Sequence, residues 1–282
     1  MSLRLAPVLA LFAFAAGCQA QTPAPSPVAP RRSAPASAPA SAASELAPAG
    51  RAMTRAMAAD AAVSDYEDGP ASADGTGRRY MGREIAGVLS HRGAAWLERD
   101  DRALEERPDI LLRALDLPPD AVVADLGAGT GYFTFRLARE VPQGRVYAVD
   151  IQREMLAIVE ARADRDDVRN VEPVLGTESN PNLPAASVDV SLLVDSYHEF
   201  AYPREMLAAL YRATRPGGRV VLVEYRAEDP NVPIRELHKM TEVQARREVE
   251  AAGFRFVENR SDLPQQHFLV FERPRGDGAT RP

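Results

Sequence analysis

The fold is decided by a stretch of ten residues, VVADLGAGTG at positions 122–131. Its first half is short and apolar, which predicts a buried β-strand over 121–125. Its second half places a glycine at every second position from 127 to 131. Glycine lets the backbone turn and approach a ligand without the clash that a Cβ atom would cause. The stretch therefore predicts a strand that passes through a ligand-binding loop into a helix over 130–140.

Strands and helices alternate regularly along the chain. Before the loop, helices are expected over 83–96 and 107–115. After it, we expect strands over 145–150, 171–175, 188–194 and 219–225, and helices over 153–163, 203–214 and 239–252. Such alternation predicts a parallel sheet with helices on both faces. The last two strands, over 254–259 and 267–272, are close in sequence and should pair as an antiparallel hairpin. The expected fold is α/β, with a mostly parallel, seven-stranded sheet.

A second acidic residue follows the glycine loop at the end of the next strand. Asp150 lies about 20 residues after the loop, the spacing at which a carboxylate meets ribose hydroxyls in nucleotide-binding α/β folds. A carboxylate suits this task because it accepts hydrogen bonds from both hydroxyls. The alternative is that Asp150 caps the following helix, a common role of aspartate. The glycine loop upstream favours ribose binding.

The glycine spacing G-x-G-x-G, led by Asp125, resembles the first motif of class I methyltransferases that use S-adenosylmethionine (SAM). A dinucleotide-binding loop would instead read G-x-G-x-x-G. The resemblance implies a Rossmann-like, doubly wound fold and SAM as the cofactor. The cofactor-binding residues that it implies here are Asp125, Gly127, Ala128, Gly129, Gly131, Asp150 and Ile151.

Further motifs of the same family follow in order. Thr177 and Glu178 come after the third strand, where the family contacts adenine, although the family often has Asp directly after the preceding glycine. Arg215-Pro216-Gly217-Gly218 precedes the fifth strand, as in many members. The resemblance covers about residues 103–272. It is closest to uncharacterised bacterial methyltransferase-domain proteins that share the stretches at 94–98 and 223–226.

Candidate catalytic residues follow the fourth strand, at the edge of the sheet where ligands bind. His198 has an ordinary pKa near neutrality and could act as a base, which is needed only if the acceptor has a proton to lose. Tyr197 could orient the acceptor, and Asp195 could hold the cofactor's amino group or the acceptor. The alternative for His198 is a packing or capping role. Glu224, Tyr225 and Arg226 end the fifth strand and could either line an acceptor pocket or form a structural ion pair.

Composition restricts the classes of partner and site. The 282 residues carry a net charge of −6, which argues against nucleic acid as the main partner and favours a small-molecule acceptor. The single cysteine, Cys18, excludes a disulfide within the chain and a zinc site of several cysteines. The four histidines are scattered without metal-ligand spacing, so that no metal site is expected.

The N-terminal part of the chain differs in composition from the rest. Residues 1–18 combine an early positive charge, an apolar run and the sequence Ala15-Ala16-Gly17-Cys18, which resembles the lipobox of bacterial lipoproteins. This predicts a lipoprotein on the periplasmic side of a bacterial membrane. Alternatives are an ordinary secretory signal, or a cytoplasmic protein with a later start codon. Residues 19–79 are expected to be a disordered Ala/Pro/Ser-rich linker, 80–272 the methyltransferase domain and 273–282 a flexible tail.

Three functions are compatible with these patterns. The first is a SAM-dependent methyltransferase acting on an unidentified small molecule. The second is a lipid-anchored module that binds SAM or another nucleoside without turnover, because SAM is made in the cytoplasm and export separates the protein from it. The third is a nicotinamide-dependent oxidoreductase, against which the glycine spacing argues. The complete set of Asp125, Gly127, Gly129, Gly131 and Asp150 favours an enzyme.

Overall fold

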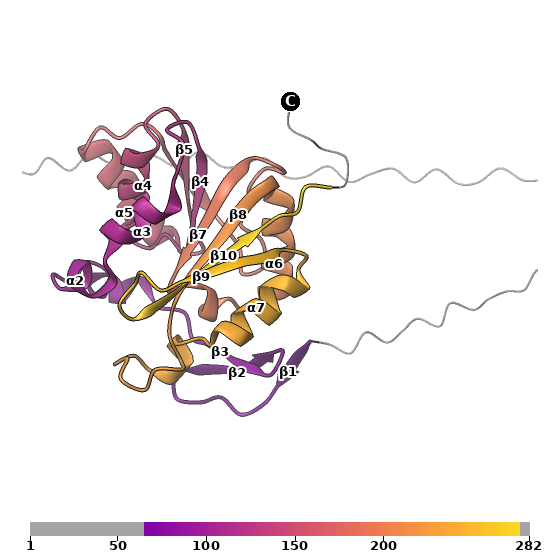
Figure 1. Cartoon of the computed structure of the whole chain (residues 1–282). Coiled ribbons are helices and arrows are strands. Elements are labelled where there is room, and N and C mark those ends of the chain that lie inside the picture. The colour runs from indigo at the N-terminus through magenta and orange to yellow at the C-terminus, as the bar shows by residue number, and fades with distance from the viewer. Residues whose placement is uncertain (1–64, 277–282) are drawn as a thin grey trace, which may run out of the picture. The chain divides into compact units, whose positions relative to one another are not determined.

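A seven-stranded sheet forms the centre of the computed structural model, which describes residues 65–276 (Figure 1). The strand order is β6-β5-β4-β7-β8-β10-β9, and β10 runs antiparallel to both neighbours while the other pairs are parallel. The strands are β4 (Val122–Leu126), β5 (Arg145–Asp150), β6 (Val171–Leu175), β7 (Val188–Val194), β8 (Thr214–Tyr225), β9 (Arg255–Arg260) and β10 (Gln266–Glu272). The predicted α/β fold with an antiparallel closing hairpin is confirmed.

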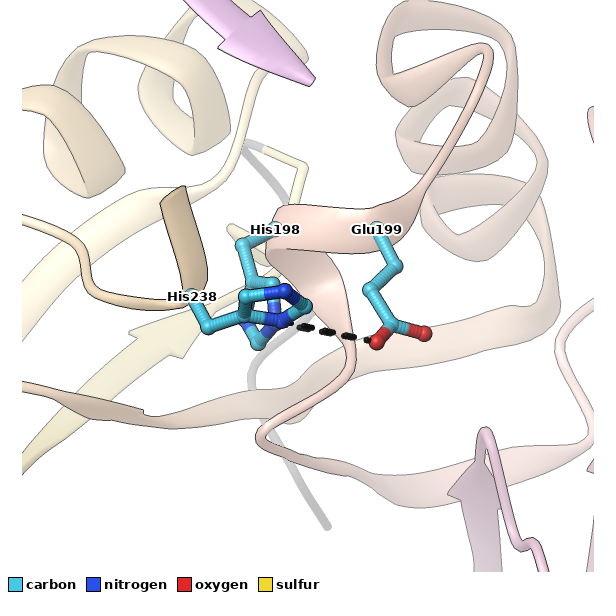
Figure 2. A group of neighbouring side chains, drawn as sticks. All are labelled: His198, Glu199 and His238. Atoms are coloured by element: carbon cyan, nitrogen blue, oxygen red, sulfur yellow. Dashed lines mark hydrogen bonds and ion pairs between the residues drawn. The ribbon is translucent and has the colours of Figure 1, made fainter. Parts of the chain in front are cut away.

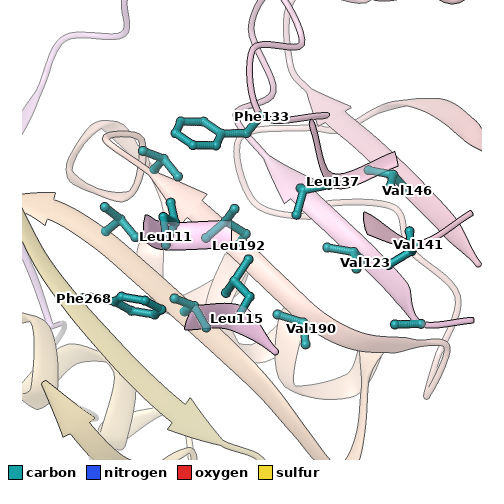
Figure 3. Packing of buried hydrophobic residues seen from close by; sticks show 14 of the residues in the cluster. Leu111, Leu115, Val123, Phe133, Leu137, Val141, Val146, Val190, Leu192 and Phe268 are labelled. Carbon is teal, nitrogen blue, oxygen red and sulfur yellow. The ribbon is translucent and has the colours of Figure 1, made fainter. Parts of the chain in front are cut away.

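Helices cover both faces of this sheet. Successive side chains of a strand point to opposite faces, so each central strand supplies apolar side chains to two cores. On one face Val123 and Leu192 pack with Leu111, Leu115 and other residues of α3 and α4 (Figure 3). On the other face the sheet packs against α6 and α7. The helices are α3 (Pro108–Leu115), α4 (Thr134–Glu140), α5 (Arg153–Arg165), α6 (Pro203–Ala213) and α7 (Glu242–Ala251).

Two helices begin later than their sequences predict. The helix after the glycine loop was expected from residue 130, but α4 begins at Thr134, because the loop and its positive-φ glycines extend to Gly131. The last helix was expected from residue 239, but α7 begins at Glu242, where the Thr241 side chain caps it by accepting from the backbone N–H of Gln244. Both differences lengthen loops at the edge of the sheet where ligands bind.

A small antiparallel sheet precedes the main one, which corrects two predictions. Residues 65–79 were expected to be linker, and residues 83–96 a helix. The structure instead has strands β1 (Tyr66–Asp68), β2 (Gly75–Tyr80) and β3 (Arg83–Ala86), in the order β1-β2-β3. They are followed by the 3₁₀ turn η1 (His91–Gly93) and the short helices α1 (Ala94–Leu97) and α2 (Arg102–Glu106).

A few specific contacts hold the small sheet together although its sequence is polar. The carboxylate of Glu84 is buried and accepts hydrogen bonds from the backbone N–H groups of Ser72 and Gly77. Tyr66 and Tyr80 pack with ring centroids 5.0 Å apart. In Figure 1, β3 lies close to α7, next to the main sheet.

The described residues, 65–276, do not include the two ends of the chain. The predicted signal sequence, its Cys18 and most of the predicted linker lie outside the described residues. In the predicted tail, Arg273 still exchanges backbone hydrogen bonds with Gly217 and Gly218 and so extends the β8–β10 pairing. Within residues 65–276, none of the helices is both long and apolar enough to cross a membrane.

Candidate active site

A cavity of about 560 Å³ opens at the carboxyl ends of β4, β5, β6 and β7. The chain runs from β4 outwards to β6 and then returns to β7 on the other side of β4, so the strand order reverses there. Open α/β sheets bind ligands at this reversal, because the loops on the two sides diverge and leave a crevice. The volume is in the range of sites for small molecules and cofactors.

The glycine loop forms one wall of the cavity. Gly127 and Gly129 line it with φ angles of 72° and 53°, in the left-handed region that favours glycine. A Cβ atom at Gly129 would come within 2.6 Å of the Leu97 side chain. Ala128 and Thr130 also line the cavity. The loop therefore brings its backbone close to any bound ligand, as the sequence predicts.

Gly131 has a different role from the one predicted. It does not line the cavity, and a Cβ atom there would lie 2.7 Å from the Phe135 ring and 3.3 Å from Val159. Its φ of 83° turns the chain into α4 while the helix packs close beneath the loop. Gly131 is thus required for packing, and its assignment to cofactor contact is corrected.

Asp125 and Asp150 both line the cavity and accept hydrogen bonds from the glycine loop or the helix that follows it. Asp125 accepts a hydrogen bond of 2.6 Å from the Thr134 hydroxyl, and burial raises its pKa to about 6. Asp150 accepts from the backbone N–H of Gly129 at 2.9 Å and of Gln152 at 2.8 Å, and burial raises its pKa as well. The N-cap of α5 is Gln152, so Asp150 is not the helix cap. Each of its oxygens keeps a second lone pair for a ligand hydroxyl.

The other predicted cofactor residues lie around the cavity's edge. Ile151 follows β5, is 38% exposed and lines the cavity. Thr177 and Glu178 follow β6 in an exposed turn that the backbone of Thr177 closes by bonding to Asn180. The structure therefore brings together eight of the nine predicted cofactor residues, with Gly131 the exception.

Asp195 lies at the junction of β7 and the loop that follows, with a φ of 46°. Its Oδ2 accepts from the Gln266 amide at 2.8 Å, whereas its Oδ1 is buried and has no hydrogen-bond partner among residues 65–276. Burial, together with the charges of Glu106 and Glu224, raises the pKa of Asp195 well above its ordinary value. A buried acceptor that lines the cavity is suited to an amino group of a ligand, and the role predicted for Asp195 stays a prediction.

Tyr197 does not face the cavity, which corrects its predicted role. The side chain is fully buried, and its hydroxyl donates to Glu248 of α7 at 2.7 Å. Its ring packs in the core beneath α6 and α7. Tyr197 therefore supports the fold and is not placed to orient an acceptor.

One polar wall of the cavity was missed by sequence reasoning. Glu106 of α2 accepts from Arg99 and Arg102 at 2.9 Å each, and the Tyr225 hydroxyl donates to it at 3.3 Å. Tyr225 belongs to the predicted acceptor-side residues and lines the cavity, but Arg226 turns away to the backbone oxygens of Leu263 and Pro264. The i,i+4 spacing of Arg102 and Glu106 was the available signal for a helix here.

His198, Glu199 and His238 meet on the acceptor side of the cavity (Figure 2). His198 and Glu199 belong to the turn η2 (Tyr197–Glu199) after β7, and His238 to the turn η3 (Glu236–His238) after β8. The Nε2 atom of His198 lies 3.1 Å from Nδ1 of His238. The two histidines are adjacent in space although 40 residues of sequence separate them, a proximity that their spacing in the sequence does not indicate.

Each of these three groups has a shifted pKa. Burial alone would lower the pKa of His198, but the charge and hydrogen bond of Glu224 outweigh it and raise the pKa. Burial raises the pKa of Glu199 to about 7, and burial and the neighbouring His198 lower that of His238. Glu224 is fully buried against His198, which shows that this end of β8 supports the cluster from behind.

The small N-terminal sheet holds this cluster in place. Arg83 of β3, whose side chain is 11% exposed, donates to both carboxylate oxygens of Glu248 at 2.9 and 3.0 Å, and to the backbone oxygen of His198 at 3.0 Å. The backbone N–H of Leu89 donates to Oε2 of Glu199 at 3.1 Å. The segment predicted to be linker and helix is therefore part of the site's framework.

Residues 123–218 match the family model described as a methyltransferase domain. This segment is thus similar to methyltransferase domains, and curated methyltransferases are similar to part of the chain. The glycine loop and the unpartnered Oδ1 of Asp195 fit SAM, the cofactor that the resemblance in sequence implies. The family model covers the strands from β4 to the start of β8, which includes η2 with His198 and Glu199 but neither β3 nor His238.

Curated relatives are similar to this chain over part of their length. An arsenite methyltransferase of Halobacterium salinarum is 34% identical over 109 residues, which are 38% of this chain and 27% of that protein. A demethylmenaquinone methyltransferase of Lactococcus lactis is 31% identical over 113 residues, 40% of this chain and 44% of that protein. The chain thus spans less than half the length of these relatives.

Solved structures show the same fold. A SAM-dependent methyltransferase from Aquifex aeolicus superposes with a TM-score of 0.63 at 22% identity, covering 66% of this chain and all of that one. A [4+2]-cyclase superposes with a TM-score of 0.54 at 16% identity, covering 69% of this chain and 88% of that one. Because a cyclase shares the fold, the fold alone does not determine the reaction.

Proposed function

We propose that this protein transfers a methyl group from SAM to a small-molecule acceptor bound beside His198, Glu199 and His238. The observation that carries the proposal is that a complete cofactor wall and this cluster line one cavity. In this proposal the wall formed by the glycine loop binds the cofactor, and the side with His198, Glu199 and His238 binds the acceptor.

The residues of the chain bind and orient, because SAM itself supplies an activated methyl group when bound. The backbone of Gly127 to Gly129 and the free lone pairs of Asp150 hold the cofactor's nucleoside. The unpartnered oxygen of Asp195 receives its amino group. Val88, Leu89 and Trp96 line the cavity, and their apolar side chains disfavour water beside a bound ligand. Positioning of this kind lowers the barrier by fixing the acceptor in line with the methyl group.

The acceptor is a small molecule in this proposal, since the whole cavity measures about 560 Å³. The named substrates of the relatives differ: one protein is an arsenite methyltransferase and another a demethylmenaquinone methyltransferase. We therefore assign no acceptor from them. The competing function, a binding module without turnover, uses the same cofactor wall but leaves the acceptor cluster without a task.

The experiment that tests the proposal is the formation of S-adenosylhomocysteine. The full chain is incubated with SAM and sets of small hydroxyl, thiol, amine and arsenite compounds, and the demethylated product is measured by mass spectrometry. We expect one class of acceptor to release it at a rate well above that of SAM alone. SAM binding without product formation from any class would favour the binding module instead.

A further inference from the structure

We propose that His198, Glu199 and His238 bind a divalent transition-metal ion at the acceptor side of the cavity. Binding of the ion is argued from the geometry of these side chains alone, whereas its task in catalysis rests on the proposed function. Ligands come from two turns, η2 and η3, that follow β7 and β8.

The three ligand atoms have the spacing of a metal site. Nε2 of His198 lies 3.1 Å from Nδ1 of His238 and 3.9 Å from Oε1 of Glu199. Nδ1 of His238 lies 3.8 Å from Oε1 of Glu199. A point equidistant from three atoms with these separations lies about 2.1 Å from each, which is the length of zinc–nitrogen and zinc–oxygen bonds. Figure 2 shows the three side chains directed at one another.

Neighbouring groups orient two of the ligands. Nδ1 of His198 is bonded to the buried carboxylate of Glu224 at 2.6 Å, and this leaves Nε2 directed at the site. A carboxylate behind a ligating histidine is the usual partner that fixes its tautomer and orientation. Oε2 of Glu199 is occupied by the backbone N–H of Leu89, so Oε1 is the oxygen directed at the two histidines.

The type of ion follows from the ligands. Two imidazoles and one carboxylate suit zinc, iron, cobalt or manganese, whereas calcium and magnesium prefer sites built from oxygen alone. Three protein ligands leave at least one coordination position open, as in catalytic zinc sites. Because all three residues line the cavity, that position faces the space for the acceptor.

The open position suits an acceptor with a hydroxyl or thiol group. Such a group loses its proton to solvent more readily when its oxygen or sulfur binds the ion. The resulting anion attacks the methyl carbon of SAM, the new carbon–oxygen or carbon–sulfur bond forms, and the bond from the methyl group to the sulfonium breaks. The electron pair of the broken bond stays on the departing sulfur, which becomes neutral.

Without an ion, the same atoms could form a hydrogen-bonded pair, with His238 donating to His198. The test separates the two arrangements by titrating the full chain, stripped with a chelator, with Zn²⁺ by calorimetry and with Co²⁺ by visible absorption. We expect one equivalent of Zn²⁺ to bind and Co²⁺ to give the absorption of a site with nitrogen ligands. His238→Ala and Glu199→Gln should each weaken the affinity at least tenfold, and Glu224→Gln about 10- to 100-fold.

Controls keep the result interpretable. His91→Ala removes a histidine that does not line the cavity and should bind Zn²⁺ like the wild type. His238 is the safest ligand to change, because its side chain is 25% exposed whereas that of His198 is 2% exposed. Zn²⁺ binding that is absent in the wild type, or unchanged in the folded His238→Ala variant, would overturn the site. SAM is titrated separately, so SAM binding without Zn²⁺ binding contradicts the metal site alone, and the reverse contradicts the proposed function alone.

Discussion

At the scale of single residues, the cavity is lined by carboxyl groups whose burial disfavours their charged forms. The pKa values of Asp125, Asp150, Asp195 and Glu199 all lie above their ordinary values, and burial is the largest cause in each case. A sulfonium cation bound among them stabilises their charged forms, since opposite charges attract strongly away from water. The cavity therefore suits a cationic cofactor better than the neutral sulfide that remains after methyl transfer.

The affinity for SAM should rise with pH between about 5 and 7. Asp125 has a pKa of about 6 in the free protein, so it is protonated at the lower pH and ionised at the higher one. A bound cation favours the ionised form, so binding below pH 6 must release a proton and is weaker. If SAM lowers the pKa of Asp125 by one unit, affinity rises about fivefold between pH 5 and pH 7 and approaches a tenfold rise only over a wider range of pH.

Calorimetric titrations at pH 5, 6 and 7 measure this dependence. Asp125→Asn removes one titrating group while keeping an acceptor for the Thr134 hydroxyl, and it should make the rise in affinity between pH 5 and pH 7 smaller. An affinity of the wild type that is independent of pH would contradict the coupling between SAM and Asp125.

At the scale of elements, the sequence predicted the main sheet better than the segments around it. The bounds of β5, β6 and β7 match the predictions. In β5 and β7 the reason is that buried strands are near-continuous apolar runs that need no partner to be recognised. The strands β1 to β3 were missed because their polar residues are satisfied only by tertiary contacts, such as those of Glu84.

The sequence likewise predicts the part of the site that lies at the ends of the main strands better than the part that other segments supply. Residues directly after a predicted strand, such as Asp150 and His198, could be placed at one edge of the sheet from topology alone. Glu106 and His238 reach the cavity from α2 and η3, whose positions depend on packing that sequence periodicity does not report. Tyr197 was misplaced because its neighbours on both sides line the cavity, and nothing in the sequence shows that its own side chain turns inward.

The link from β3 to the site should be important for stability. Arg83→Met leaves the buried carboxylate of Glu248 without its ion partner, which costs about 3–5 kcal/mol for a buried pair. The control is Arg145→Met, which breaks the exposed pair with Glu172 and should cost about 0–1 kcal/mol. Urea denaturation of both variants measures the free energy of unfolding. Equal losses for the two variants would show that Arg83 does not brace the site as described.

At the scale of the whole molecule, the methyltransferase domain is one part of a chain whose first 64 residues lie outside the described structure. The lipobox ending in Cys18 stays a prediction from sequence. We propose on this basis that the protein is a lipoprotein facing the bacterial periplasm, which a fatty-acid label present in the wild type and absent in Cys18→Ala would support. A label that persists in the variant would contradict it. The location matters because it determines how SAM reaches the cavity.

The most direct measurement is a calorimetric titration of the full chain with SAM and, separately, with NAD. The account predicts saturable binding of SAM and no binding of NAD. Gly129→Ala should weaken SAM binding at least tenfold, because its Cβ enters a loop that lines the cavity. Gly82→Ala, a matched change at a φ of 87° with open space around it and outside the cavity, should bind SAM like the wild type. Absence of SAM binding, or equal binding by the Gly129 variant, would contradict the central claim that this cavity is a SAM site.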